Sequence, residues 1–218
     1  MNRLTSKNIY AYKRVLIILR RELLMKDSIY PQMKIIETDK YILRPICVED
    51  AISMFEYYSQ DKVVKYLPIK THKSIVETKR FIRNYFINSY KKGNVNHWAI
   101  IDKKNNKLIG NIGLNNVSNK DKEAEIGICI NPIYWGNDIA TDLTKYSLMY
   151  GFKVLNLEKI TATTYEENPR TRKSLESLGF KYVKTYDKKM KISNSMKMIK
   201  CDKYELYRKN YILSRYLD

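Results

Sequence analysis

The sequence predicts a mixed α/β (α+β) domain built around one central sheet. Of its 218 residues, 44% are hydrophobic, which is enough for a buried core. Segments with the alternation of a strand and segments with the periodicity of a helix follow one another along the chain. In particular, Glu123–Ile130 predicts a buried strand that leads through a short loop, marked by Pro132, into a helix.

Residues 1–32 are expected to form an N-terminal helical appendage, and residues 33–218 the main domain. Within the appendage, Asn8–Lys26 has apolar residues at helical spacing and basic residues on the other face. Its uninterrupted apolar run, Val15–Leu19, is too short for a membrane span or a signal peptide. We expect this extra helix to pack on a partner or a sister subunit, with association with a membrane surface as the alternative.

Before residue 115 the sequence predicts a strand, two helices and a hairpin. The acidic pair Glu49 and Asp50 is typical of a helix start, and Ser74 with Glu77 three residues later forms a capping box. Turn formers at residues 103–106 connect the two strands of the hairpin. The predicted elements are a strand at Tyr41–Arg44, helices from about Val48 and after Ser74, and strands at His97–Asp102 and Lys107–Leu114.

After residue 130 the pattern continues with two helices and two or three strands. Asn168 and Pro169 open a helix that Gly179 ends. The segment Cys201–Tyr211 fits a last strand or a closing helix, and both interpretations stay open. The other predicted elements are a helix from about Asp138 to Val154 and strands at Leu157–Thr164 and Phe180–Tyr186.

The net charge of +18 is concentrated near the two ends of the chain. Residues 1–26 and 181–203 together supply +12 of it. Such an excess attracts nucleic acid, a ribosome or an anionic coenzyme, or it remains a solvated surface without a partner. It argues against polycations as preferred substrates.

The three cysteines, Cys47, Cys129 and Cys201, are far apart and odd in number. No CxxC or His/Cys spacing accompanies them, so we expect neither a disulfide framework nor a metal site. This usage favours a reducing, cytoplasmic location.

The strand–loop–helix of residues 123–140 predicts an anion site. The first N–H groups of a helix have no partner within the helix, and the helix dipole favours a negative charge beside them. A loop that delivers a strand into such a helix start is a common phosphate-binding arrangement.

Four segments in this order resemble the GNAT superfamily of N-acetyltransferases, and most closely the branch that contains the ribosomal-protein N-terminal acetyltransferases. They are YILRPICVED (41–50), LIGNIGL (108–114), AEIGICINPIYWGNDIAT (124–141) and ENPRTRKSLESLGF (167–180), and the resemblance covers about residues 35–190. It implies a mostly antiparallel, twisted sheet of about six to seven strands, splayed between its fourth and fifth strands and flanked by helices.

The resemblance also implies acetyl-CoA as cosubstrate, without a metal. The pantetheine arm would pair with the strand at Ile128, Cys129 and Ile130, and Asn168 would hydrogen-bond to it while also capping its own helix. The pyrophosphate would be held by the loop and helix start, Trp135, Gly136, Asn137, Asp138, Ile139, Ala140 and Thr141.

Asp138 departs from the family pattern, which has glycine at this place. Aspartate tolerates a left-handed backbone better than most residues, so the loop geometry can survive. A carboxylate beside the pyrophosphate would oppose it by about 4 kcal/mol before screening, at about 4 Å and an effective dielectric constant of about 20. We expect the side chain to cap the helix that begins at Ile139, which removes most of this repulsion.

Two residues are candidates for catalysis through the resemblance. Glu125 matches a glutamate that binds or deprotonates the substrate amine, with an ordinary carboxylate paired to a lysine as the alternative. Thr171 falls where relatives carry a serine that protonates or orients the leaving thiolate, and water is an equal alternative. Leu175 stands where many relatives have a tyrosine acid. We expect His97 to be structural and Cys129 not to act as a nucleophile.

These observations predict an N-acetyltransferase that moves an acetyl group from acetyl-CoA to a primary amine, by direct attack of the amine. The amine would belong to a protein N-terminus or to a small molecule, and the fold does not choose between them. The alternative is a non-catalytic protein of the same fold that binds acyl-CoA or RNA, or a ribosome, through its basic segments. A homodimer is a further expectation, and Tyr57, Tyr58, Tyr66 and His72 are candidates for an acceptor pocket.

Overall fold

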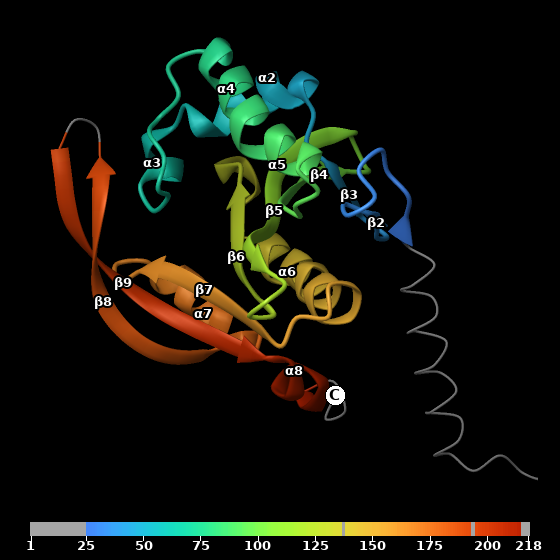
Figure 1. The fold of residues 1–218 in the computed structure, drawn as a ribbon. Coiled ribbons are helices and arrows are strands. Elements are labelled where there is room, and N and C mark those ends of the chain that lie inside the picture. Colours follow the sequence, from blue (N-terminus) through green and yellow to red (C-terminus); the bar gives the residue numbers. More distant parts are fainter. Residues whose placement is uncertain (1–24, 137, 193–194, 215–218) are drawn as a thin grey trace, which may run out of the picture.

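The computed structural model describes residues 25–136, 138–192 and 195–214. In this part of the chain one nine-stranded sheet runs in the order β1-β2-β3-β4-β5-β6-β7-β9-β8 (Figure 1). Every neighbouring pair is antiparallel except β6 and β7, which are parallel. The strands are β1 (Met25–Lys26), β2 (Ile35–Glu37), β3 (Tyr41–Pro45), β4 (His97–Asp102), β5 (Lys107–Ser118), β6 (Glu123–Ile130), β7 (Lys159–Tyr165), β8 (Lys181–Ile192) and β9 (Ser195–Tyr207).

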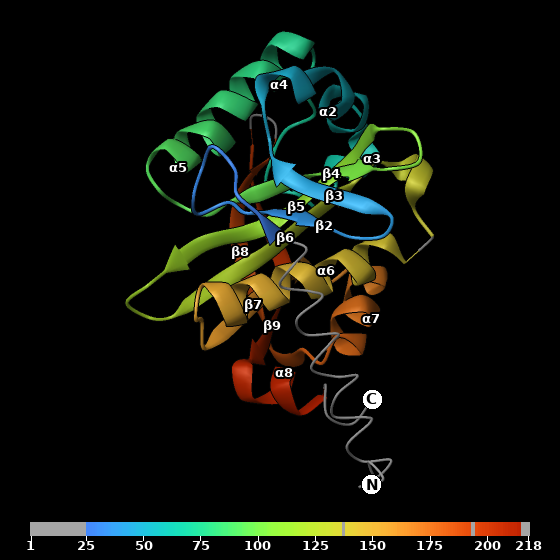
Figure 2. The same ribbon diagram turned by 90° about the vertical axis from the view of Figure 1, so that its right-hand side faces the viewer.

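Helices cover both faces of the sheet. The helices α2, α4 and α5 lie on one side of it, and α6 and α7 lie on the other (Figures 1 and 2). The helical elements are η1 (Val48–Asp50), α2 (Ala51–Tyr58), α3 (Asp61–Val64), α4 (Ile75–Phe81), η2 (Ile82–Ile87), α5 (Asn88–Lys91), η3 (Pro132–Tyr134), α6 (Ile139–Met149), η4 (Tyr150–Val154), α7 (Pro169–Ser177) and α8 (Arg208–Ser214). Among the described residues, no helix is long and apolar enough to cross a membrane.

The alternation along β5 shows how the two faces differ. Asn111 lies on the α2 face, where it accepts hydrogen bonds from Tyr57 and Tyr58. Leu114 points the other way and packs near Gly151, which follows α6. Both faces of β5 are buried between residues 108 and 114, so the central strands form the core between two helical layers.

The sheet was predicted to splay between its fourth and fifth strands, which are β6 and β7 of the structure, and the splay is confirmed there. The two strands pair only at their first residues, and the last pair is Glu125 with Thr161. From residue 126 to residue 130, β6 continues beside β5 alone. The remaining edge of β6 therefore faces a fork in the sheet, which we call the β6/β7 fork.

Most predicted elements form where the local pattern placed them, and β4 has the predicted bounds. The start of α4 differs from the predicted capping box in one detail. Ser74 Oγ accepts a hydrogen bond from the N–H of Glu77 at 3.2 Å, as expected. The Glu77 carboxylate instead accepts from the N–H of Lys73, one residue before the cap. The cap is thus satisfied from both sides, although the reciprocal bond is shifted by one residue.

The C-terminal region differs more from the prediction. Its lysine-rich segment belongs to a long antiparallel hairpin, in which β8 and β9 pair from Lys181 with Glu205 to Ile192 with Ser195. The segment for which a strand and a helix both stayed open contains the end of β9 and then α8.

The expected N-terminal appendage lies mostly outside the described residues, which begin at residue 25. The last two residues of the predicted helix, Met25 and Lys26, form β1 instead and pair with Ile36 and Ile35 of β2. Gln32 also donates a hydrogen bond to the carbonyl of Tyr90 at 2.7 Å. Residues 25–32 therefore contact the sheet and the helical layer, and the division of the chain at residue 33 stays a prediction.

Candidate active site

The β6/β7 fork leaves one edge of a central strand without a strand partner. On this edge lie the residues predicted to hold an extended ligand arm, Ile128, Cys129 and Ile130. Ile128 and Ile130 pair with Ile112 and Gly110 of β5 through their other edge. An open strand edge can accept an extended chain through main-chain hydrogen bonds. The fork thus has the form that the expected pantetheine arm requires.

The loop after β6 is tied back onto the strand. Asn131 Oδ1 accepts a hydrogen bond from the N–H of Ile133 at 3.3 Å, which caps the short turn η3. The indole N–H of Trp135 donates to the carbonyl of Ile130 at 2.8 Å, although 42% of this side chain is exposed. Gly136 follows with φ of 88°, a backbone conformation that favours glycine. Asn137, predicted to be part of the same loop, lies outside the described residues.

Asp138 has the predicted backbone but not the predicted side-chain contact. Its φ of 51° and ψ of 12° are left-handed, and its side chain makes no capping hydrogen bond to α6. The expectation that it caps the helix is therefore wrong. A capping residue normally has an extended backbone, which directs its side chain toward the N–H groups of the first turn. The exposed carboxylate remains at the positive end of the α6 dipole.

The starts of α6 and α7 are linked. Thr141 Oγ1, in the first turn of α6, donates a hydrogen bond to Ser174 Oγ of α7 at 3.3 Å. Asn168 Oδ1 accepts from the N–H of Thr171 at 3.3 Å, so Asn168 caps α7 as predicted. Leu175, which stands where many relatives have a tyrosine that acts as an acid, is buried. The predicted contacts of Asn168 and Thr171 with a coenzyme stay predictions.

Glu125 occupies the base of the β6/β7 fork, at the last residue pair before the strands part. Its carboxylate is half-buried and accepts a hydrogen bond from Asn116 Nδ2 at 3.5 Å. Tyr85 of η2 lies on the same face of the sheet. Burial, and secondly the negative charge of Glu125, raise the pKa of Tyr85, so its phenol stays neutral and can donate a hydrogen bond.

A chain of hydrogen bonds runs behind Glu125 into the core. Asn111 Oδ1 accepts from two tyrosine hydroxyls at 2.9 Å each, so its amide nitrogen faces His97 Nδ1, at 2.7 Å. Because that amide can only donate, His97 carries its proton on Nε2 and donates to Asn115 Oδ1 at 3.1 Å. The Tyr85 hydroxyl donates to the same oxygen at 2.9 Å. The chain fixes the orientation of Asn115 and Tyr85 beside Glu125.

His97 is held neutral in this chain. Burial lowers its pKa to about 4, although the hydrogen bond to Asn115 acts in the other direction. A protonated ring would also place an N–H on Nδ1 directly against the amide of Asn111. The structural role expected of His97 is therefore supported, and His97 is not poised as a base near neutral pH.

Cys129 and three of the four residues expected near an acceptor pocket are buried in the core. Burial raises the pKa of the Cys129 thiol, so it stays protonated, and its side chain faces away from Ile128 and Ile130 as expected. Tyr57 and Tyr58 are buried, and His72 Nδ1 is hydrogen-bonded to Thr78 Oγ1 at 2.9 Å. Of the four candidate pocket residues only Tyr66 lies near the surface.

The sequence reasoning missed Tyr85, Asn111 and Asn115. One signal could have found the two asparagines, because Asn111, Gly113 and Asn115 alternate along one face of a strand whose other face is aliphatic. A row of polar and small residues on a buried strand face predicts a polar network or a close approach. Tyr85 has no such signal.

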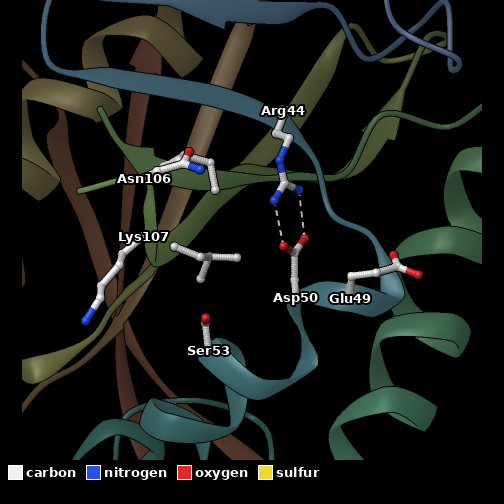
Figure 3. A pocket seen from close by; sticks show the side chains of 8 residues that line it. Arg44, Glu49, Asp50, Ser53, Asn106 and Lys107 are labelled. Atoms are coloured by element: carbon white, nitrogen blue, oxygen red, sulfur yellow. Dashed lines mark hydrogen bonds and ion pairs between the residues drawn. The ribbon is translucent and has the colours of Figure 1, made fainter. Parts of the chain in front are cut away.

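A pocket of about 340 Å³ lies away from the fork residues, between η1, α2 and the turn that joins β4 to β5 (Figure 3). Arg44 forms two hydrogen bonds to the buried carboxylate of Asp50, at 2.6 and 2.8 Å, on one side of it. None of the predicted site residues lines this pocket. The Arg44 and Asp50 charges in its wall already neutralise each other, and their ion pair anchors η1 to β3.

Comparisons with known proteins agree with this geometry. The model of an acetyltransferase (GNAT) domain matches residues 40–181. The chain is 33% identical over 146 residues to the uncharacterized N-acetyltransferase YoaA of Bacillus subtilis, an alignment that covers 67% of this chain and 82% of that protein.

Two solved structures show the same fold. Spermidine N-acetyltransferase from Vibrio cholerae, in complex with CoA and spermine, has a TM-score of 0.69 and 20% identity and covers 80% of this chain and 99% of its own. Ribosomal-protein-S5-alanine acetyltransferase from Vibrio fischeri has a TM-score of 0.69 and 20% identity, with 81% and 98% covered. Because the family model spans more than half of the sequence, the chain belongs to the GNAT acetyltransferase family.

Proposed function

We propose that this protein is an N-acetyltransferase that transfers the acetyl group of acetyl-CoA to a primary amine. The observation that carries the proposal is the β6/β7 fork, which combines an open strand edge with a half-buried carboxylate, Glu125, at its base. The helix start of α6 follows directly on the same strand. One strand–loop–helix thus offers an open strand edge for the extended arm, a helix start for the phosphates and the Glu125 carboxylate for the amine.

Acetyl-CoA would be held by main-chain groups. The edge of β6 at Ile128–Ile130 suits the pantetheine arm, and the N–H groups of the first turn of α6 suit the pyrophosphate. Gly136 leaves open space where a side chain would begin, since no atom lies within 4 Å of its Cβ position. Asp138 would weaken this binding, because its exposed carboxylate adds a negative charge at the start of α6, where the pyrophosphate would lie.

Glu125 would receive the amine. The amine attacks the thioester carbonyl, the new amide bond forms, the bond from carbon to sulfur breaks, and CoA leaves as the thiol. The proton lost by the amine passes to Glu125 or to water, and the thiolate gains one from Thr171 or from water. Tyr85 and Asn115, whose orientation is fixed by the hydrogen bonds to His97, would orient the amine toward the thioester carbonyl.

Calorimetry and a turnover assay test this proposal. We expect saturable binding of acetyl-CoA and release of free CoA when amines are supplied, including ribosomal proteins and small amines. The Glu125→Gln variant should lose about 100-fold or more in kcat if the carboxylate removes the proton. Absence of acetyl-CoA binding at millimolar concentration would reject the function.

Glu123→Gln is the matched control. Glu123 lies two residues earlier on the same strand and face, and it forms an ion pair with Lys159 at 2.7 Å. Its loss should leave kcat within about twofold, because exposed ion pairs contribute little. Equal turnover in Glu125→Gln and the wild type would remove Glu125 from the mechanism while leaving acetyl-CoA binding intact.

A further inference from the structure

The hairpin of β8 and β9 carries a row of lysines on the face of the sheet that Glu125 occupies. Glu125 lies opposite Thr161 of β7, and Thr161 lies opposite Glu205 of β9. Because side chains alternate along a strand, every second residue of β9 from Glu205 shares this face, together with its partner on β8. Besides Lys181, which pairs with Glu205 itself, the lysines placed there by the register are Lys203, Lys184, Lys188 and Lys197. We call these four residues the lysine row.

Ion pairs on the two faces agree with this placement. On the Glu125 face, Lys203 forms an ion pair with Glu205 at 3.1 Å. The opposite face is turned toward α7, where Asp202 forms an ion pair with Arg172 at 3.6 Å.

The segment after α3 stands over the same face as the lysine row. The ring of Tyr66 meets that of Tyr165, at the end of β7, with centroids 5.8 Å apart. The Tyr66 hydroxyl donates to the carbonyl of Glu167 at 3.3 Å. The neighbouring Lys65 ammonium lies 4.9 Å from the Tyr66 ring and adds a positive charge there. In Figure 1, α3 and the hairpin both stand on the side of the fork where β6 and β7 diverge.

The charges on this face are unbalanced. Glu205 is shared between Lys159 at 3.6 Å and Lys203 at 3.1 Å, so it is already neutralised. Among the ion pairs that the described residues form, none involves Lys184, Lys188 or Lys197. Glu123 and Glu205 on this face are paired with lysines, whereas Glu125 forms no ion pair with the described residues. A substrate that enters the fork along this face therefore meets one unpaired carboxylate, Glu125, followed by a row of positive groups.

We propose that the acceptor is the N-terminal amine of an acidic peptide segment, with its amine at Glu125 and its carboxylates along the lysine row. This inference rests on the proposed function and names its substrate class. On a flat sheet, two strand spacings and the rise along β9 separate Glu125 from Lys203 by about 12 Å and from Lys197 by about 28 Å, and a third spacing puts Lys188 of β8 about 25 Å away. An extended peptide at about 3.3 Å per residue would then place its acidic side chains at about positions five to nine.

The chemistry favours a peptide over two other charged partners. Nucleic acid has the required negative charge but offers no aliphatic primary amine to Glu125. A polyamine has the amine, but its remaining charges would face the lysine row and be repelled. An acidic peptide satisfies both parts of the surface.

The test compares two decapeptides that share residues one to four and differ at positions five to nine, one carrying four glutamates and the other four lysines. Full-length protein with acetyl-CoA is assayed by CoA release, and peptide binding is measured in parallel by fluorescence anisotropy. We expect kcat/KM to be about tenfold or more higher for the acidic peptide at low salt, with the difference shrinking toward 1 M salt. Spermidine should be a poorer acceptor than the acidic peptide.

Charge reversal on the two faces of the hairpin provides the matched control. The double variant Lys188→Glu, Lys197→Glu should lose the preference for the acidic peptide while keeping turnover of a small neutral-bodied amine. The double variant Lys189→Glu, Lys200→Glu changes the same total charge on the opposite face and should keep the preference.

Three outcomes would overturn the inference. Equal kcat/KM for both peptides would remove the peptide preference and leave the proposed function standing. Equal effects of the two double variants would show that only total charge matters. Salt-sensitive binding of a single-stranded RNA that depends on Lys188 and Lys197, with peptide acetylation indifferent to charge, would assign the row to nucleic acid. Failure of all amines to release CoA rejects the proposed function itself.

Discussion

Acidification should destabilise this protein through one buried histidine. His97 is buried with a pKa lowered to about 4, whereas a histidine in the unfolded chain titrates near 6.5. Between these two values only the unfolded state takes up the proton. The free energy of unfolding therefore falls as pH drops through this window, levels off below it, and is fully retained above pH 6.5.

The size of the effect follows from the shift. A difference of about 2.5 pKa units corresponds to about 3 kcal/mol. This is a large part of the stability of a typical domain, which is about 5–15 kcal/mol. The other histidine, His72, also has its pKa lowered, mainly by burial, and contributes in the same direction. The tyrosines of the chain behind Glu125 have raised pKa values and stay neutral throughout this range.

Urea unfolding followed by circular dichroism at several pH values between 7 and 4 measures the effect. His97→Gln keeps a donor that can reach Asn115 but has no group that titrates in this range. The wild type should lose about 3 kcal/mol more than the variant between pH 7 and 4. Parallel stability curves for the two proteins would refute the reasoning.

A spectroscopic measurement covers the case in which His97→Gln does not fold. The chain has two histidines, so a His72→Gln variant identifies both ring signals in a proton spectrum. The His97 signal should stay at the chemical shift of a neutral ring down to about pH 5, since its pKa is about 4. A midpoint near 6.5 for this signal would also refute the reasoning.

Three further predictions concern single positions. Gly127→Ala should cost about 1–3 kcal/mol in denaturant unfolding, because the added Cβ would lie 2.8 Å from Asn115 Nδ2; a cost below about 0.5 kcal/mol would contradict this close packing. Asp50→Asn should cost about 2 kcal/mol and lower Tm by several degrees, since the Arg44 guanidinium loses its charged partner; an unchanged Tm would show that the pair adds nothing. Asp138→Gly should tighten acetyl-CoA binding by about tenfold at low salt in calorimetry, because it removes a negative charge and suits the left-handed backbone; equal affinity would mean that the carboxylate points away from the phosphates.

Local rules predicted those parts of the site that depend on a few neighbouring residues. Asn168 caps α7, and Gly179, with φ of 88°, ends it, both as expected from cap and turn chemistry. The left-handed backbone of Asp138 also follows from its residue type. The direction of its side chain does not follow from residue type. Aspartate favours both a helix cap and a left-handed backbone, but the cap requires an extended backbone, and the loop imposes the left-handed one.

The sequence by itself determined most of the strands and helices between Tyr41 and Phe180, because periodicity, caps and turns act over a few residues. The family resemblance added the fork and Glu125. Only the tertiary structure decided that Tyr85, Asn115 and His97 meet beside Glu125, since these residues come from separate elements joined by sheet register and helix packing. Register also placed Lys188 on the face of Glu125 and Lys189 on the other. A shift of one residue would exchange the two faces, and no local pattern of alternating lysines fixes that choice.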